Sequence, residues 1–142
     1  MTVEEKRAWI MAAVSPGAFA VYAAIILVRA GGAPLRDVPY VSTMLWTIGI
    51  SIVVSIVLHI VAAITSGADA HKKDVRDREI YRFGDTVGQV FIFLGAVAAM
   101  GLAMAEVSHF WITHVIYLGF AVGTCLGSLA KIAAYRDGIP DC

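Results

Sequence analysis

The amino-acid sequence predicts an all-α, polytopic membrane protein with four transmembrane helices, a single domain over residues 1–142 and both termini in the cytoplasm. Hydrophobic residues make up 59% of the chain and charged residues 15%, whereas about a quarter of the residues in a soluble domain are charged. Four apolar stretches each reach the roughly twenty residues that cross a ~30 Å hydrocarbon core. The charges gather in the connections between these stretches, which argues against a basic face that binds nucleic acid.

The first predicted span covers about residues 8–28. Lys6 and Arg7 precede it, as basic residues precede the core of a signal peptide, but the apolar run is longer than the ~7–15 residues of a cleaved segment. We therefore expect an uncleaved span. Pro16 lies inside it and is expected to bend the helix, because proline removes a backbone hydrogen bond.

The second predicted span covers about residues 40–65 and follows a loop rich in glycine and proline. The third covers about residues 83–105 and the fourth about residues 109–132. A tight turn at Glu106–Ser108 joins these last two spans, and the Ser108 hydroxyl is expected to cap the fourth helix. A charged segment, residues 66–82, separates the second span from the third.

Lysine and arginine flank the spans unequally. The N-terminus, the charged segment and the C-terminal tail together hold nine of the eleven basic residues, and the loop between the first two spans holds Arg29 and Arg36. Cytoplasmic loops of membrane proteins carry the excess of basic residues. We therefore expect the charged segment and both termini in the cytoplasm, and we place the protein in a bacterial inner membrane.

Two stripes of small or polar residues are expected to pack the helices together. Span four carries Gly119, Gly123 and Gly127 at a spacing of four, a double GxxxG pattern that lets another backbone approach closely. Span two carries a polar ladder at the same spacing, consisting of Thr43, Thr47, Ser51, Ser55 and His59. The matching spacing predicts that spans two and four touch along these stripes, within one chain or across a dimer. Gly95, Ala99 and Ala103 offer a similar face on span three.

His59 is the one ionisable residue well inside a span, and such residues are often functional. A structural hydrogen bond to a neighbouring helix is the favoured interpretation, ahead of proton transfer, ligand contact or metal binding. Haem is disfavoured, because the predicted depths of His59 and His114 differ by about 18 Å. His109 and His114 are five residues apart and point to different sides of a helix, so a metal site with Glu106 is disfavoured as well. We expect no cofactor, no metal and no catalytic constellation.

The charged segment shows acid–base pairs at a spacing of four, Asp74 with Arg78 and Lys73 with Asp77, which indicate helical extensions of spans two and three. A break is expected near Gly67 or Gly84, and Asp85 is expected to pair with Lys131 or Arg82. The segment is interpreted first as a solvated topology signal that faces lipid headgroups. A docking surface for a cytoplasmic protein is the second interpretation, and a phosphate site the third.

The pattern Asp74-x-Arg76-Asp77-x-x-Ile80 resembles the charged signature of a family of small prokaryotic four-helix membrane proteins of unknown function. Val75 stands where the family has an acidic residue, and the resemblance extends over about residues 74–135. Some members of the family are encoded beside small helix-turn-helix regulators. The resemblance therefore implies a docking role and supplies no catalytic residues.

The sequence thus predicts a non-enzymatic accessory, assembly or regulatory subunit. Its expected partners are membrane lipid and either a protein partner or a second copy of the chain. The residues expected to contact a partner or anionic lipid are Lys72, Lys73, Arg76, Asp77, Arg78 and Arg82. The alternative is a small transporter or channel in which the polar ladder from Thr43 to His59 lines a path.

Overall fold

The computed structural model describes residues 3–67 and 74–139 and confirms the all-α fold with four long helices in those ranges. The helices are α1 (Val3–Ala30), α2 (Val41–Ser66), α3 (Val75–Met104) and α4 (His109–Asp137), and a short 3₁₀ turn, η1 (Leu35–Asp37), lies between α1 and α2. Each helix has 26 to 30 residues and is apolar enough to cross a membrane. α1, α3 and α4 are longer than their predicted spans, whereas α2 has the predicted length and is shifted by one residue along the chain.

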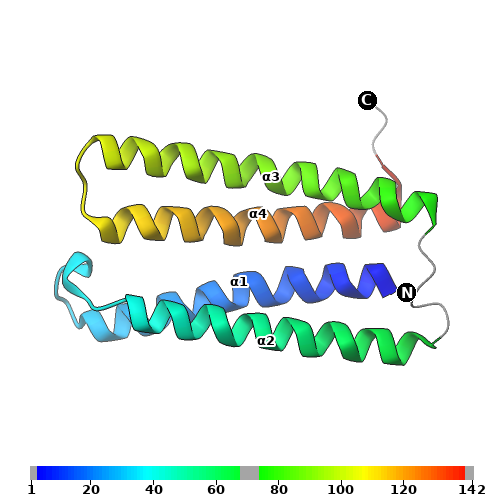
Figure 1. Ribbon diagram of the computed structural model, residues 1–142, viewed down its shortest axis with the longest axis horizontal. Helices are drawn as coiled ribbons and strands as arrows, with labels where there is room; N and C mark the ends of the chain where they lie inside the picture. Colours follow the sequence, from blue (N-terminus) through cyan, green and yellow to red (C-terminus); the bar gives the residue numbers. More distant parts are fainter. Residues whose placement is uncertain (1–2, 68–73, 140–142) are drawn as a thin grey trace.

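The four helices run alternately up and down and form a flattened bundle (Figure 1). They lie side by side in the order α3, α4, α1, α2, and each helix packs mainly on its neighbours in that row. The start of α1, the end of α2, the start of α3 and the end of α4 share one end of the bundle, which we call the termini end. The opposite end, where α1 is joined to α2 and α3 to α4, is called the loop end.

Glycines bring the backbones of α3 and α4 into direct contact. A methyl group placed on Gly88 would lie 2.7 Å from the carbonyl oxygen of Gly123, and one placed on Gly127 would lie 2.8 Å from the carbonyl oxygen of Gly84. Further along, a methyl group on Gly119 would lie 3.1 Å from the Cα atom of Gly95. The backbones of the pair are thus in close contact from Gly84 to Gly95 on α3 and from Gly119 to Gly127 on α4.

The predicted packing of span two on span four is wrong within a single chain. The glycine stripe of α4 faces α3, and α1 lies between α4 and α2. The physical reason is that α3 has its own four-spaced glycines, Gly84 and Gly88, which fit a flat partner face. On α2, by contrast, only Thr43, Met44 and Ala62 are buried.

The predictions for the ends of α2, α3 and α4 are confirmed only in part. α2 stops at Gly67, whose φ of 61° is left-handed, whereas Gly84 lies inside α3 without a break. Asp74 caps α3 in a reciprocal capping box with Asp77, so it does not form the predicted pair with Arg78. Ser108 precedes α4 as predicted, but its hydroxyl makes no capping hydrogen bond.

Replacing Gly88 by alanine is expected to destabilise the protein by about 1–3 kcal/mol, because the added methyl group overpacks the contact with α4. Gly101→Ala is the matched control on the same helix, where a methyl group meets nothing within 4 Å. Unfolding of the purified protein by sodium dodecyl sulfate in mixed micelles, followed by circular dichroism, measures both variants. An equal loss of stability in the two would contradict the contact.

Candidate functional site

Three arginines project from the first eight residues of α3. Arg76, Arg78 and Arg82 are exposed, and within the described ranges their guanidinium groups have no hydrogen-bond or ion-pair partner. Lys72 and Lys73, which the sequence grouped with them, lie outside the described residues. The three arginines therefore form an exposed basic cluster, which we call the α3 arginine surface; the exposed Glu79 lies among them on the helix but makes no ion pair with them.

Asp77 belongs to the same turn of α3 but is engaged within the chain. Its Oδ1 atom accepts a hydrogen bond from the Tyr135 hydroxyl at 2.8 Å, and its Oδ2 atom accepts one from the backbone N–H of Asp74 at 3.1 Å. These bonds tie the start of α3 to the end of α4. Asp77 is therefore a structural residue in this fold, and we leave it out of the α3 arginine surface.

A network of charged and aromatic side chains joins α1, α3 and α4 at the termini end. Glu4 is only 3% exposed; its Oε1 atom lies 3.2 Å from Nη1 of Arg7, and its negative charge interacts with the Tyr81 side chain of α3. Lys131 Nζ lies 2.7 Å from Oδ1 of Asp85, as predicted, and 4.0 Å from the centre of the Tyr81 ring. Glu4 was not among the residues predicted from the sequence, although its spacing of three from Arg7 at the start of an apolar helix was a usable signal.

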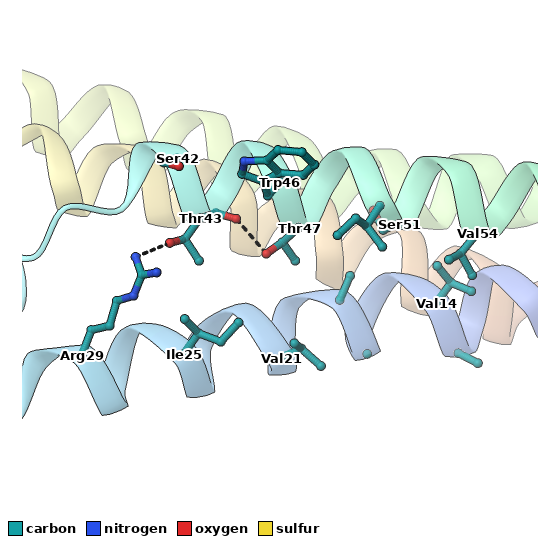
Figure 2. Close-up of a pocket in the computed structure, with 14 residues that line it drawn as sticks. Val14, Val21, Ile25, Arg29, Ser42, Thr43, Trp46, Thr47, Ser51 and Val54 are labelled. Atoms are coloured by element: carbon teal, nitrogen blue, oxygen red, sulfur yellow. Dashed lines mark hydrogen bonds between the residues drawn. The ribbon is translucent and has the colours of Figure 1, made fainter.

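The part of the polar ladder nearest the loop end, Thr43, Thr47 and Ser51 of α2, lines a groove between α1 and α2 with a volume of about 570 Å³ (Figure 2). The Thr47 and Ser51 hydroxyls donate to carbonyl groups of their own helix, those of Thr43 and Ile48, both at 2.8 Å. The ladder therefore does not join α2 to another helix through these two hydroxyls. The donor of each of these two hydroxyls is thus used within α2.

Two long cationic side chains connect α1 to α2 instead. Arg29 Nη1 donates to the Thr43 hydroxyl at 2.6 Å at the loop end, where Figure 2 shows the two side chains meeting across the gap. Lys6 Nζ donates to the Ser66 hydroxyl at 3.1 Å at the termini end. A hydrogen bond thus joins α1 to α2 at each end of the pair, and the groove lies between these two bonds. We call the two bonds, Lys6–Ser66 and Arg29–Thr43, the clasps.

His59 and Ser55 line a second hollow of about 410 Å³, which is bounded by α1, α2 and α4. The imidazole is half-buried, and its Nδ1 atom is buried without a hydrogen-bond partner among the described residues. The predicted structural hydrogen bond from His59 to a neighbouring helix is therefore not made through this nitrogen.

His114 forms the centre of a buried cluster at the loop end. Its Nδ1 atom lies 2.6 Å from the carbonyl oxygen of Phe110, and its Nε2 atom lies 2.5 Å from the Tyr22 hydroxyl. A carbonyl group only accepts, so Nδ1 carries the proton and, in the neutral ring, Nε2 accepts the hydrogen bond that Tyr22 donates. Both nitrogens are engaged, whereas His109 is exposed. His114 thus holds α1 against α4.

The described residues contain no group of three His, Cys, Asp or Glu side chains placed to hold a metal ion. Comparison of the chain with protein-family models, with curated proteins and with solved structures finds no match. The proposals below therefore rest on the sequence and on the geometry of the chain itself.

Replacing Tyr22 by phenylalanine is expected to destabilise the protein by about 1–2 kcal/mol, because it leaves His114 Nε2 without its donor inside the membrane. Tyr117→Phe is the matched control. Its ring packs on Tyr22, but its hydroxyl has no hydrogen-bond partner within residues 3–67 and 74–139. The same micellar unfolding assay measures both, and a control variant that lost as much stability would contradict the assigned bond.

Proposed function

We propose that this multi-pass membrane protein is a non-enzymatic accessory, assembly or regulatory subunit of a bacterial inner membrane. It contacts a protein partner or anionic lipid through the α3 arginine surface. The observation that supports this proposal is the exposure of Arg76, Arg78 and Arg82 without an acidic partner among the described residues.

The guanidinium groups of these arginines remain available to an external anion. The nearby carboxylates of Asp74 and Asp77 accept hydrogen bonds from the backbone at the start of α3, and the exposed Glu79 carboxylate makes no ion pair with the arginines. Arg78 and Arg82 are four residues apart and share one face of the helix. A guanidinium group presents its donors in a planar fork that matches carboxylate and phosphate groups, which are the anions of protein surfaces and lipid headgroups.

Several other polar side chains within the helices have structural partners. Asp85 of α3 binds Lys131 of α4, and His114 of α4 binds Tyr22 of α1. This use of polar groups as links between helices supports a scaffold or accessory role. The alternative transporter is less well supported, because the Thr47 and Ser51 hydroxyls of the polar ladder bond to their own helix.

The proposed orientation places both termini and the α3 arginine surface in the cytoplasm. It is supported by the excess of basic residues in the N-terminus, the charged segment 66–82 and the C-terminal tail, which together hold nine of the eleven in the sequence. The same orientation gives the arginines access to soluble cytoplasmic proteins and to the anionic inner leaflet.

The joint replacement of Arg76, Arg78 and Arg82 by alanine is expected to lower the recovery of a co-purifying partner or anionic lipid at least about tenfold. The three-lysine variant keeps the charge. It is expected to retain anionic lipid, for which charge suffices, and to lose a carboxylate partner that needs the planar fork. Extraction in mild detergent, followed by mass spectrometry of proteins and lipids, measures both. Arg36→Ala serves as the control, and an unchanged set of partners and lipids in the alanine variant would overturn the proposal.

The orientation is tested with reporter fusions to the full chain and to its first loop. A green fluorescent protein fused after Cys142 is expected to fluoresce, and alkaline phosphatase fused there is expected to be inactive. Phosphatase fused after Gly32 is expected to be active, because the loop between α1 and α2 would lie outside the cytoplasm. The reverse pattern, or phosphatase activity at both positions, would contradict the orientation.

A further inference from the structure

The groove between α1 and α2 is apolar along most of its length and charged at one end only. Small residues of α1 hollow it out, among them Ala13, Gly17 and Ala18, and its walls are completed by residues such as Val21 and Ile50. Among the lining residues, the only charged side chain is that of Arg29 at the loop end (Figure 2). An apolar channel with one cation at its mouth has the amphipathic pattern of a lipid.

Arg29 is held in place but not neutralised. Its side chain is exposed, and Nη1 donates to the Thr43 hydroxyl, an uncharged partner. Within residues 3–67 and 74–139, no carboxylate lies within ion-pair distance of Arg29. A guanidinium group has five N–H donors, so others remain available for an anion at the mouth of the groove.

The position of the groove matches the polar boundary of a bilayer. Arg29 lies in the last turn of α1, and Trp46, which also lines the groove near this end, is 71% exposed. Tryptophan and arginine near helix ends commonly lie at the level of lipid headgroups. The mouth of the groove therefore lies where a phosphate group would be, and its apolar part where acyl chains would be.

The dimensions of the groove favour an acyl chain over a helix. The groove extends about 24 Å along α1 from Arg29 to Ala13. It is therefore long enough for an acyl chain, which spans the ~15 Å of one leaflet of the hydrocarbon core. A helix about 10 Å across would need roughly three times the 570 Å³ of the groove over that length. A volume of this size lies within the ~300–1,000 Å³ of small-molecule sites.

We propose that the α1–α2 groove is a binding site for an anionic phospholipid, with one acyl chain in the groove and the phosphate group paired with Arg29. This site uses the opposite end of the bundle from the α3 arginine surface and does not depend on the function proposed above.

The test is native mass spectrometry of the delipidated full chain, titrated with phosphatidylglycerol or with phosphatidylcholine of the same acyl chains. Wild type is expected to bind phosphatidylglycerol about tenfold more tightly, because its headgroup lacks a cation that would compete with Arg29. Arg29→Ala is expected to lose this preference and Arg29→Lys to keep part of it. Equal binding of the two lipids by wild type, or the same preference in Arg29→Ala, would overturn the proposal.

A second pair of variants tests the apolar part of the site. Gly17 lines the groove and Gly49 does not, and a methyl group on either would meet nothing within 4 Å. Gly17→Leu is expected to fill the groove and weaken binding of both lipids, whereas the matched control Gly49→Leu binds as wild type. Circular dichroism checks that both remain folded. Undiminished lipid binding by Gly17→Leu would also overturn the proposal. So would a mass spectrum in which wild type is a dimer without bound lipid, because a second copy of the chain would then be the occupant.

Discussion

The contact between the backbones of α3 and α4 is the interaction on which the rest of this fold depends. Lipid tails are as apolar as leucine, so burying apolar surface gives little reason for helices to associate in a membrane. Close packing must supply the attraction, and it falls steeply with distance. Glycines on both helices remove the side chains that would keep the backbones apart. α3 and α4 therefore form a firm pair, and α4 offers its other side to α1.

A different chemistry attaches α1 to this pair. Near the termini end the buried Glu4 carboxylate meets Tyr81, and near the loop end the Tyr22 hydroxyl meets His114. Both links join groups that would be costly to leave unpaired in an apolar medium. They also fix the height of α1 relative to its neighbours, which apolar contacts alone would leave free to slide. Packing thus holds one half of the row together, and polar interactions attach the other half.

The number and type of the helices could be predicted from the sequence, because length and apolar composition are local properties. Which helices touch could not. The glycine stripe at Gly119–Gly127 was visible, but Gly84 was interpreted as a possible break in a polar segment, although it belongs to the matching face of α3. A break and a close contact both favour glycine, and only the three-dimensional arrangement separates them.

The partners of the candidate site residues were equally hard to predict from the sequence. Arg29 was counted as a loop charge. The Thr43 hydroxyl that accepts its hydrogen bond lies on another helix, so the sequence around Arg29 does not reveal this partner. Glu4 was missed because its burial is a property of the folded chain that no local pattern reports. For Asp85 two partners were predicted, Lys131 and Arg82, and the structure shows the pair with Lys131.

The clasps between α1 and α2 have a mechanical consequence. Lys6 and Arg29 reach across the gap with long, flexible side chains, whereas α3 and α4 meet backbone to backbone. A long side chain can keep its hydrogen bond when the distance between the two helices changes, whereas a backbone contact cannot. α1 is itself held to α4 by the bond between Tyr22 and His114. Lateral compression or expansion of the protein in the plane of the membrane is therefore taken up by α2, and the row has one stiff side and one compliant side.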